Sequence, residues 1–435
     1  MKIRQTISSL MVAAILLSVC ALPALGQATV SNSITIPPSS VAKASDGGAR
    51  AHTNVILGSG PMTGVAQPSG GPPFPGYFFE TPASIACIYG LVPRTPGCNS
   101  NVVTENPNGG SRAIAIVDAY DYSAAAADMA VFTSQFGVAP ASNFHVVYAP
   151  FGGSTPGSCS TTGPGPEPAS AAGTGWDIEE SLDTQYAHAM APQATLYLVE
   201  AQSESFADLL CAVTVASDLV AKAGGGEVSM SWGTGEPASF SAQYPAQTSM
   251  DPVFTQHGVV YFAAAGDSPG PLWPSTSPNV VSAGGTTLST DATTGNFLLE
   301  DTWADAGGGP STVESRPPYQ NGIAYLVGTQ RGTPDIAAVA NPYTGVWVYN
   351  STYLGFGAWW IVGGTSVATP LMAGVVNAAG SFSASSYQEL SKIYSKPTGF
   401  TEILYGTCGL YIGNFAMPGW DFCTGWGSPR GYSGK

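Results

Sequence analysis

Short apolar segments alternate with segments of helical length between residues 112 and 265. Short segments rich in apolar residues predict strands at 112–118, 144–149, 195–201, 227–232 and 259–265. The segments between and after them predict helices at 124–136, 176–190, 206–223 and 365–379, and one that ends at 253–257. Strands buried on both faces and separated by helices are typical of a parallel sheet with helices on both sides. The sequence therefore predicts an α/β fold with ligands at the carboxyl ends of the strands.

Composition excludes several classes of protein. The chain has 435 residues, of which 44% are hydrophobic and only 9% charged, so it is too apolar to be a disordered polyelectrolyte. Its formal net charge is −15, whereas nucleic acids and anionic membranes are bound by clustered Lys and Arg. We therefore expect a globular protein that binds neither nucleic acid nor membrane.

Residues 1–26 have the pattern of a secretory signal peptide. Lys2 and Arg4 precede an apolar run over 10–22, and Ala24 and Gly26 supply the small residues of a cleavage site. The chain is therefore expected to be secreted, either to the extracellular space or to the periplasm. Cys20 would allow a lipoprotein, which the preceding Val19 disfavours.

The segment 27–75 is rich in Ser, Ala, Gly and Pro and shows no sustained periodicity. This composition predicts a flexible leader or a short pro-segment. The pattern changes near Tyr77, so we expect one folded domain over 76–435.

Cleavage after Gly26 leaves an even number of cysteines, which favours disulfides in an exported protein. The six are Cys87, Cys98, Cys159, Cys211, Cys408 and Cys423. Six cysteines allow 15 pairings, and sequence does not choose among them. Loop lengths suggest 87–98, 159–211 and 408–423. Metal binding is the alternative, but the chain has no CxxC or His-rich spacing to support it.

The first candidate for chemistry is the segment 363–374, which reads GGTSVATPLMAG. The glycine pair before a helical run puts Ser366 at a helix N-terminus, where the helix dipole favours developing negative charge. The alternative is that Thr365 or Ser366 is only an N-cap.

The second candidate is the helix 176–190. Glu179 and Asp183 are four residues apart and therefore share one face. An acidic first turn would explain other acids of this helix, but like charges at this spacing repel by about 0.2–0.5 kcal/mol. A shared proton would relieve that repulsion. His188 lies about half a turn away around the axis, so it does not join this pair.

The third candidate is Asp267, which follows the predicted strand 259–265 at its carboxyl end. An ionised carboxylate would repel an oxyanion, whereas a protonated one can donate a hydrogen bond to it. The alternative is an Asp that only forms a turn.

These three segments contain EExLD, AAGD and GTSxATP in that order, and the combination resembles the sedolisin (serine-carboxyl peptidase) family. The resemblance runs from about Glu80 to Gly427. Further matching stretches are SMSWG at 229–233, RGTPD at 331–335 and GWD at 419–421. The resemblance implies a subtilisin-like fold and a single peptidase domain.

The resemblance also implies a role for each residue. Ser366 would attack the scissile carbonyl, Glu179 would take its proton, Asp183 would orient Glu179, and Asp267 would donate to the oxyanion. A carboxylate base titrates far below histidine, so an acidic pH optimum is expected.

By position in the family, the strand that pairs with the substrate backbone would contain Ser231, Trp232 and Gly233. The alternative is an ordinary core strand. The partners expected are protein or peptide substrates, and the chain is expected to be a monomer.

The family also carries a calcium site near the C-terminus. The matching positions here are Glu402, Ile403, Met417, Gly419 and Asp421, and oxygen-only ligation suits Ca²⁺. Glu402 stands where the family has Asp, and Met417 where Gly is usual. Cys408 and Cys423 flank the region, and a disulfide there could brace it instead.

Two alternatives to an acid endopeptidase stay open. Family members are made with a pro-domain much longer than residues 27–75. The first alternative is therefore a secreted binding module that has the same fold and no catalytic activity. The second is a conventional peptidase that uses Asp118, His188 and Ser366.

Overall fold

The structure is a computed structural model that describes residues 33–43, 49–67, 70–236, 247–409 and 414–435. The predicted signal peptide, 1–26, lies outside the described residues. The described residues belong to one packed unit, 32–435. No helix among them is long and apolar enough to cross a bilayer.

An α/β architecture with a mainly parallel central sheet is confirmed. The strand order is β11-β10-β8-β6-β3-β5-β4, β14 also pairs with β10, and only the β10–β11 pairing is antiparallel. The bounds are β3 (Ala113–Ala119), β4 (Phe144–Tyr148), β5 (Thr195–Ala201), β6 (Gly226–Met230), β8 (Val259–Ala264), β10 (Val281–Thr290), β11 (Phe297–Thr302) and β14 (Ile336–Val339).

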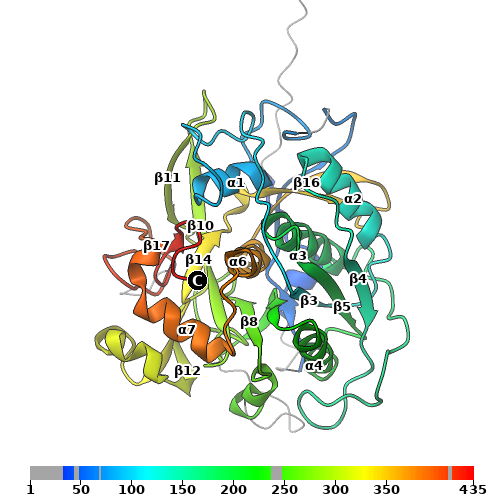
Figure 1. The fold of residues 1–435 in the computed structure, drawn as a ribbon, viewed down its shortest axis with the longest axis vertical. Coiled ribbons are helices and arrows are strands. Elements are labelled where there is room, and N and C mark those ends of the chain that lie inside the picture. Colours follow the sequence, from blue (N-terminus) through cyan, green and yellow to red (C-terminus); the bar gives the residue numbers. More distant parts are fainter. Residues whose placement is uncertain (1–32, 44–48, 68–69, 237–246, 410–413) are drawn as a thin grey trace, which may run out of the picture. The chain divides into compact units, whose positions relative to one another are not determined.

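Helices cover both faces of this sheet. Successive side chains of a strand point to opposite faces. Ile114 and Ile116 of β3 pack in the cluster that contains the side chains of α2 (Ala125–Phe136), α3 (Trp176–Met190) and α6 (Thr365–Ala379). Ala115 and Val117 pack with α4 (Phe206–Lys222) in the second cluster. In Figure 1, α3 and α6 lie side by side and α4 lies across β3 and β5 from them.

Most of the predicted elements are present, and two differ. The predicted strand 227–232 breaks at Ser231 into β6 and a separate strand, β7 (Trp232–Gly235). The segment expected to end a helix at 253–257 holds only a 3₁₀ turn, η4 (Asp251–Phe254). Pro252 lacks an amide hydrogen and Gly258 takes a positive φ of 82°, so the chain turns into β8 at once.

Part of the predicted flexible leader is packed structure. Strand β1 (His52–Thr53) pairs with β7, and β2 (Ile56–Met62) pairs with β16 (Ala358–Gly363), which in turn pairs with β15 (Val346–Asn350). The turn η1 (Pro38–Ser40) lies beside β1. These described residues pack against the expected domain, and its start at residue 76 stays a prediction. Strand β1 has only two residues, and β2 contains Gly58, Gly60 and Pro61, so neither leaves a periodicity to detect.

The remaining elements are short and lie around this frame. They are α1 (Pro82–Ile88), α5 (Ala324–Val327), α7 (Ser386–Ser395), β9 (Leu272–Trp273), β12 (Gly309–Ser315), β13 (Gln330–Thr333), β17 (Phe400–Thr401) and β18 (Ser428–Pro429), with the 3₁₀ turns η3 (Gln247–Ser249), η5 (Pro318–Ile323), η6 (Pro342–Thr344) and η7 (Pro397–Gly399).

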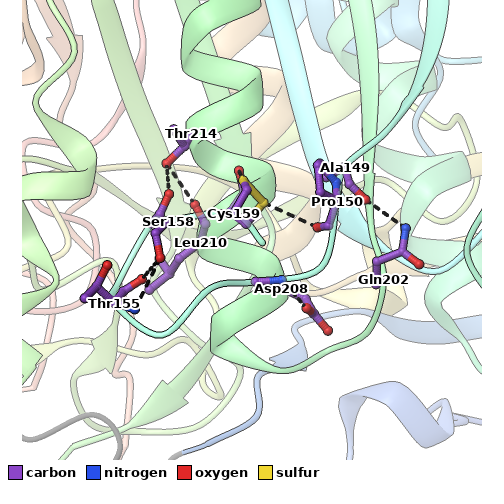
Figure 2. The surroundings of a disulfide bond; sticks show 12 residues. Ala149, Pro150, Thr155, Ser158, Cys159, Gln202, Asp208, Leu210 and Thr214 are labelled. Atoms are coloured by element: carbon purple, nitrogen blue, oxygen red, sulfur yellow. Dashed lines mark hydrogen bonds between the residues drawn. A yellow bond between two sulfur atoms is a disulfide. The ribbon is translucent and has the colours of Figure 1, made fainter. Parts of the chain in front are cut away.

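All three suggested disulfides are present, between Cys87 and Cys98, Cys159 and Cys211, and Cys408 and Cys423. The second joins the loop after β4 to α4 (Figure 2). Around it, Gln202 donates from Nε2 to the Ala149 carbonyl at 2.8 Å. The bridge thus fastens a long loop to a helix beneath the sheet.

Candidate active site

The candidate nucleophile, Ser366, is the second residue of α6 and is fully buried. Strand β16 ends at Gly363, and Gly364 turns the chain into the helix with a φ of 99°. A Cβ on Gly364 would lie 2.0 Å from the backbone oxygen of Asn54 and 2.5 Å from Oδ2 of Asp267. Glycine is needed here because two oxygen atoms approach the turn that carries the serine.

Helix α3 brings two carboxyl groups, those of Glu179 and Asp183, to the same place, and Ser231 connects Asp183 to Ser366. The Ser231 hydroxyl donates to Oδ1 of Asp183 at 2.9 Å, and the Ser366 hydroxyl donates to the Ser231 carbonyl at 3.2 Å. The side chains of Glu179 and Asp183 are fully buried. Both oxygens of Glu179 and Oδ2 of Asp183 have no hydrogen-bond partner among the described residues.

The pKa of each of these two carboxyls lies well above its usual range. Burial is the largest cause for Glu179, and the negative charges of Asp183, Asp118 and Asp267 add to it, while the nearby Ser366 hydroxyl lowers the pKa. Burial also dominates for Asp183, followed by the charge of Asp118, whereas the Ser231 hydroxyl and the neighbouring Glu179 lower the pKa of Asp183. Mutual repulsion means that both groups are not ionised together.

Glu179 and Ser366 are close without being joined by a hydrogen bond. The hydroxyl lowers the pKa of Glu179, yet in this structure it donates to the Ser231 carbonyl and leaves both oxygens of Glu179 unpartnered. Contacts of this kind are often long before a substrate is positioned.

Asp267 lies beyond the carboxyl end of β8, as predicted, and faces the start of α6. Its Oδ1 accepts hydrogen bonds from the amide and the hydroxyl of Thr365, at 2.7 and 2.8 Å. Its Oδ2 is buried without a partner among the described residues. Burial raises the pKa of Asp267 to about 7, against the lowering effect of the Thr365 hydrogen bonds. Below that pH, Oδ2 can carry a proton and donate a hydrogen bond.

Asp118 is a further carboxyl that the sequence left as an alternative triad member. It is the sixth of the seven buried residues of β3 and has no hydrogen-bond partner among the described residues. Burial raises its pKa to about 8, and its charge acts on both Glu179 and Asp183. The sequence signal for its place near the site is a single carboxylate at the end of an apolar parallel strand.

His188 does not support the conventional triad. Its Nε2 bonds the Ala139 carbonyl at 2.7 Å, and burial lowers its pKa. Among the described residues, neither Asp118 nor Ser366 forms a hydrogen bond with it.

The predicted substrate strand has two distinct sides. The Trp232 side chain is core, because it is fully buried and donates from Nε1 to the Val117 carbonyl at 2.7 Å. The backbone of Trp232 and Gly233 pairs antiparallel with Thr53 and His52. The strand therefore already holds an extended segment along its backbone.

The positions matched to calcium ligands lie close together in two turns. Asp421 accepts hydrogen bonds from the amides of Cys423 and Thr424 at 2.9 and 2.8 Å and of Met417 at 3.2 Å, and Glu402 accepts one from the amide of Gly419. No described residue donates to the backbone carbonyls of Ile403, Met417 or Gly419. No group of three or more acidic, His or Cys side chains suited to a metal occurs among the described residues. Two carboxylates with three free carbonyls still form a donor set that fits Ca²⁺.

Part of this chain is similar in sequence to known proteins. No family model matches it. Sedolisin of Pseudomonas sp. (strain 101) is 35% identical over 175 residues, kumamolisin of Bacillus sp. (strain MN-32) 31% over 291, and tripeptidyl-peptidase 1 of Mus musculus 28% over 195. These matches cover 36%, 59% and 37% of this chain. The chain spans half or less of each relative's length, at 28%, 50% and 32%.

A solved structure of Pseudomonas sedolisin, a serine-carboxyl proteinase complexed with two molecules of pseudo-iodotyrostatin, has a similar fold. It superposes with a TM-score of 0.61 at 24% identity, over 84% of this chain and 96% of that one. A psychrophilic protease named S41 superposes with a TM-score of 0.51 at 19% identity. Both similarities concern the fold.

Proposed function

This chain belongs to the sedolisin family and has its subtilisin-like fold, and from that premise we propose that it is a serine-type endopeptidase that hydrolyses proteins at acidic pH. The observation that carries the proposal is that Ser366, the pair Glu179 and Asp183, and Asp267 converge on one buried site from α6, α3 and the end of β8.

In this mechanism Ser366 attacks the substrate carbonyl and passes its proton to Glu179. Asp183 and Glu179 share one proton, so that the pair carries one negative charge and Glu179 keeps an oxygen that can accept a proton. Glu179 then returns the proton to the leaving amine, and water repeats the sequence to release the acid. The unpartnered oxygens of Glu179 support this role, because they leave it free to accept from Ser366.

The oxyanion would lie between two donors, the backbone amide of Ser366 and the protonated Oδ2 of Asp267. Asp267 is held by Thr365 through Oδ1, so Oδ2 is the free oxygen. A neutral carboxyl donates a hydrogen bond, whereas a carboxylate would repel the oxyanion, which is why this site requires an acidic medium.

The substrate would be an extended protein segment that pairs with β7 through backbone hydrogen bonds, as β1 does here. The three disulfides support an oxidising compartment, so we propose that the protein acts after export. We also propose that it acts as a monomer.

Cleavage of an unfolded protein measured from pH 2 to pH 8 tests this function. We expect a bell-shaped profile whose alkaline side falls near pH 7, because Asp267 loses its proton there. Asp267→Asn should remove that alkaline limb, since an amide donates at every pH. Asp267→Ala should lower kcat by about 10²–10³-fold across the whole range.

An alkaline limb that stays at the same pH in Asp267→Asn would contradict the role of Asp267 as a protonated donor. If no cleavage occurs at any pH, the protein is instead a binding module on a peptidase fold. Binding of an unfolded protein without its hydrolysis would then be the activity to measure.

We also propose a calcium ion at Glu402, Ile403, Met417, Gly419 and Asp421. The side chains of Glu402 and Asp421 and the three free backbone carbonyls would hold it. A bound divalent ion would neutralise the two carboxylates and fasten two turns beside the Cys408–Cys423 disulfide.

Chelation of calcium should therefore lower the melting temperature without changing the arrangement of Ser366, Glu179 and Asp183. We expect calcium to raise the midpoint of thermal unfolding by several degrees in the parent, because a ligand that binds only the folded state stabilises it. Asp421→Asn should abolish that rise, whereas Asp291→Asn, at a partly exposed carboxylate in another turn, should not. Equal midpoints with chelator and with calcium would count against the site.

A further inference from the structure

Glu236, the residue that follows β7, accepts hydrogen bonds from several segments of the chain. Its Oε1 accepts from Nε2 of Gln247 at 2.6 Å and from the Thr276 hydroxyl at 2.7 Å. Its Oε2 accepts from the amide and the hydroxyl of Thr312 at 2.8 and 3.3 Å. The Ser311 hydroxyl reaches both oxygens, at 3.0 and 2.9 Å. Donors from η3, from β12 and from the loop after β9 therefore converge on one carboxyl group.

These hydrogen bonds fasten the end of β7 to its neighbours. The last residue of β7, Gly235, pairs with Leu272 of β9. The Thr276 amide donates to the Leu272 carbonyl at 3.1 Å, and the Thr276 hydroxyl donates to Glu236. Glu236 thus closes a ring between β7 and β9, and its hydrogen bonds from β12 fix that ring to a third strand.

The side chains of β7 itself hold only the first half of the strand. Trp232 is buried and donates from its indole to the Val117 carbonyl. Further along, Thr234 is partly exposed and Gly235 is exposed, and a Cβ on Gly235 would meet no atom within 4 Å. The far end of β7 therefore depends on its short pairing with β9 and on Glu236.

The other edge of β7 is the one that the proposed substrate would take, as β1 does in antiparallel pairing. The Ser366 hydroxyl donates to the Ser231 carbonyl at 3.2 Å, so the candidate nucleophile lies just before the first residue of β7. Glu236 is five positions further along, or roughly 17 Å at about 3.3 Å per residue. A substrate that runs antiparallel to β7 would therefore place the residues before the scissile bond along Trp232 and Gly233, in the direction of Glu236.

We propose that Glu236 is a positioning residue for the substrate strand, an inference that rests on the proposed peptidase function. By fixing the far end of β7, Glu236 keeps the backbone of Trp232 and Gly233 extended before a substrate arrives. A strand that is ordered in advance does not have to be ordered at the expense of binding free energy. Only a peptide that reaches Gly233 gains from this order, so Glu236 favours substrates with three or more residues before the scissile bond.

Two peptides with the same scissile bond test this role at about pH 4, one with four residues before that bond and one with two. In the parent we expect the longer peptide to have the lower KM. Glu236→Gln should raise that KM by about 2- to 10-fold, the range for one hydrogen bond, because its NH₂ group cannot accept from the surrounding donors. The kcat for the longer peptide and the KM of the shorter one should stay as in the parent, since neither depends on the far end of β7.

Two further variants accompany Glu236→Gln. Thr276→Val keeps the shape of the side chain and removes one donor, so it should give a smaller rise in the same KM, and it replaces Glu236→Gln as the test if that variant does not fold. Asp291→Asn is the control, because Asp291 also accepts several hydrogen bonds, from Thr293 and Thr294, but lies between β10 and β11. We expect it to leave the KM of both peptides unchanged.

The kinetic constants separate positioning from a general structural role. An unchanged KM for the longer peptide, a KM that rises by the same factor for both peptides, or a change in kcat alone would overturn the positioning by Glu236 and leave the peptidase standing. A parent that hydrolyses neither peptide at any pH from 2 to 8 would overturn the proposed function and this inference with it.

Discussion

Replacing Ser366 by alanine should lower kcat for peptide hydrolysis by about 10⁶-fold, the scale of loss when a serine peptidase loses its nucleophile. The reason is local, since Ser366 is the hydroxyl at the start of α6 that lies beside Glu179. The substitution removes one oxygen atom from a buried site and keeps the helix. The measurement is hydrolysis of a chromogenic peptide at acidic pH, with circular dichroism to show that the fold is unchanged.

Glu179→Gln should cause a comparable loss, because an amide of the same shape accepts no proton. The double variant Ser366→Ala/Glu179→Gln should be no worse than either single one, since the two groups act as a unit. Losses that multiply in the double variant would contradict a shared role.

His188→Gln is the matched control for the base. Glutamine can still bond the Ala139 carbonyl, so the packing of α3 is preserved. We expect its activity and pH profile to be those of the parent. Loss of neutral-pH activity in this variant alone would favour the Asp118–His188–Ser366 alternative.

Much of the fold could be predicted because its strands and helices carry strong local signals. Helices α3 and α6 have the predicted bounds, and β3, β5 and β8 lie within one residue of them. These elements are long and apolar on the side that packs. Strand β1 has only two residues, and its place is set by pairing with β7, some 180 positions away in the chain. No sequence window contains that information.

The candidate active site likewise contains residues that the sequence predicted and residues that it did not. The sequence motifs named Ser366, Glu179, Asp183 and Asp267, and the structure brings these side chains to one place. Thr365, which holds Asp267, looked like an N-cap candidate only. Asn54 lay in a segment whose composition suggested flexibility. Both reach the site only through contacts with distant residues, so geometry was required to find them.

The free energy of unfolding should fall steeply as the pH rises from about 5 to 8. Burial raises the pKa of Glu80 and of Glu227 to about 8, far above the value of a carboxyl in an unfolded chain. Below about pH 4.5 both groups are protonated in the folded and in the unfolded state. Their ionisation therefore does not lower the free energy of unfolding there. Between that pH and 8 the unfolded chain releases its protons while the folded protein keeps them. The folded state is therefore destabilised as the pH rises.

Within the part of the chain that the structure describes, neither group has an ion pair to offset its burial. Glu80 accepts a hydrogen bond from Ser84 at 2.5 Å. Glu227 accepts one from Asn377 at 2.7 Å, and its pKa is raised further by Glu389 and lowered by Arg112 and Lys392. One hydrogen bond does not replace the hydration that an ionised carboxylate loses in the interior.

Urea unfolding of Glu80→Gln and Glu227→Gln at pH 5 and pH 8 measures the effect. Each pKa unit corresponds to about 1.4 kcal/mol, so each variant should remove at most about 4 kcal/mol of the parent's loss between the two pH values. Glutamine can still accept from Ser84 or Asn377, so stability at pH 5 should change little. Glu167→Gln, at an exposed position, should leave the loss as it is in the parent. If both buried variants keep the parent's full pH dependence, the burial of these carboxyls is not its cause.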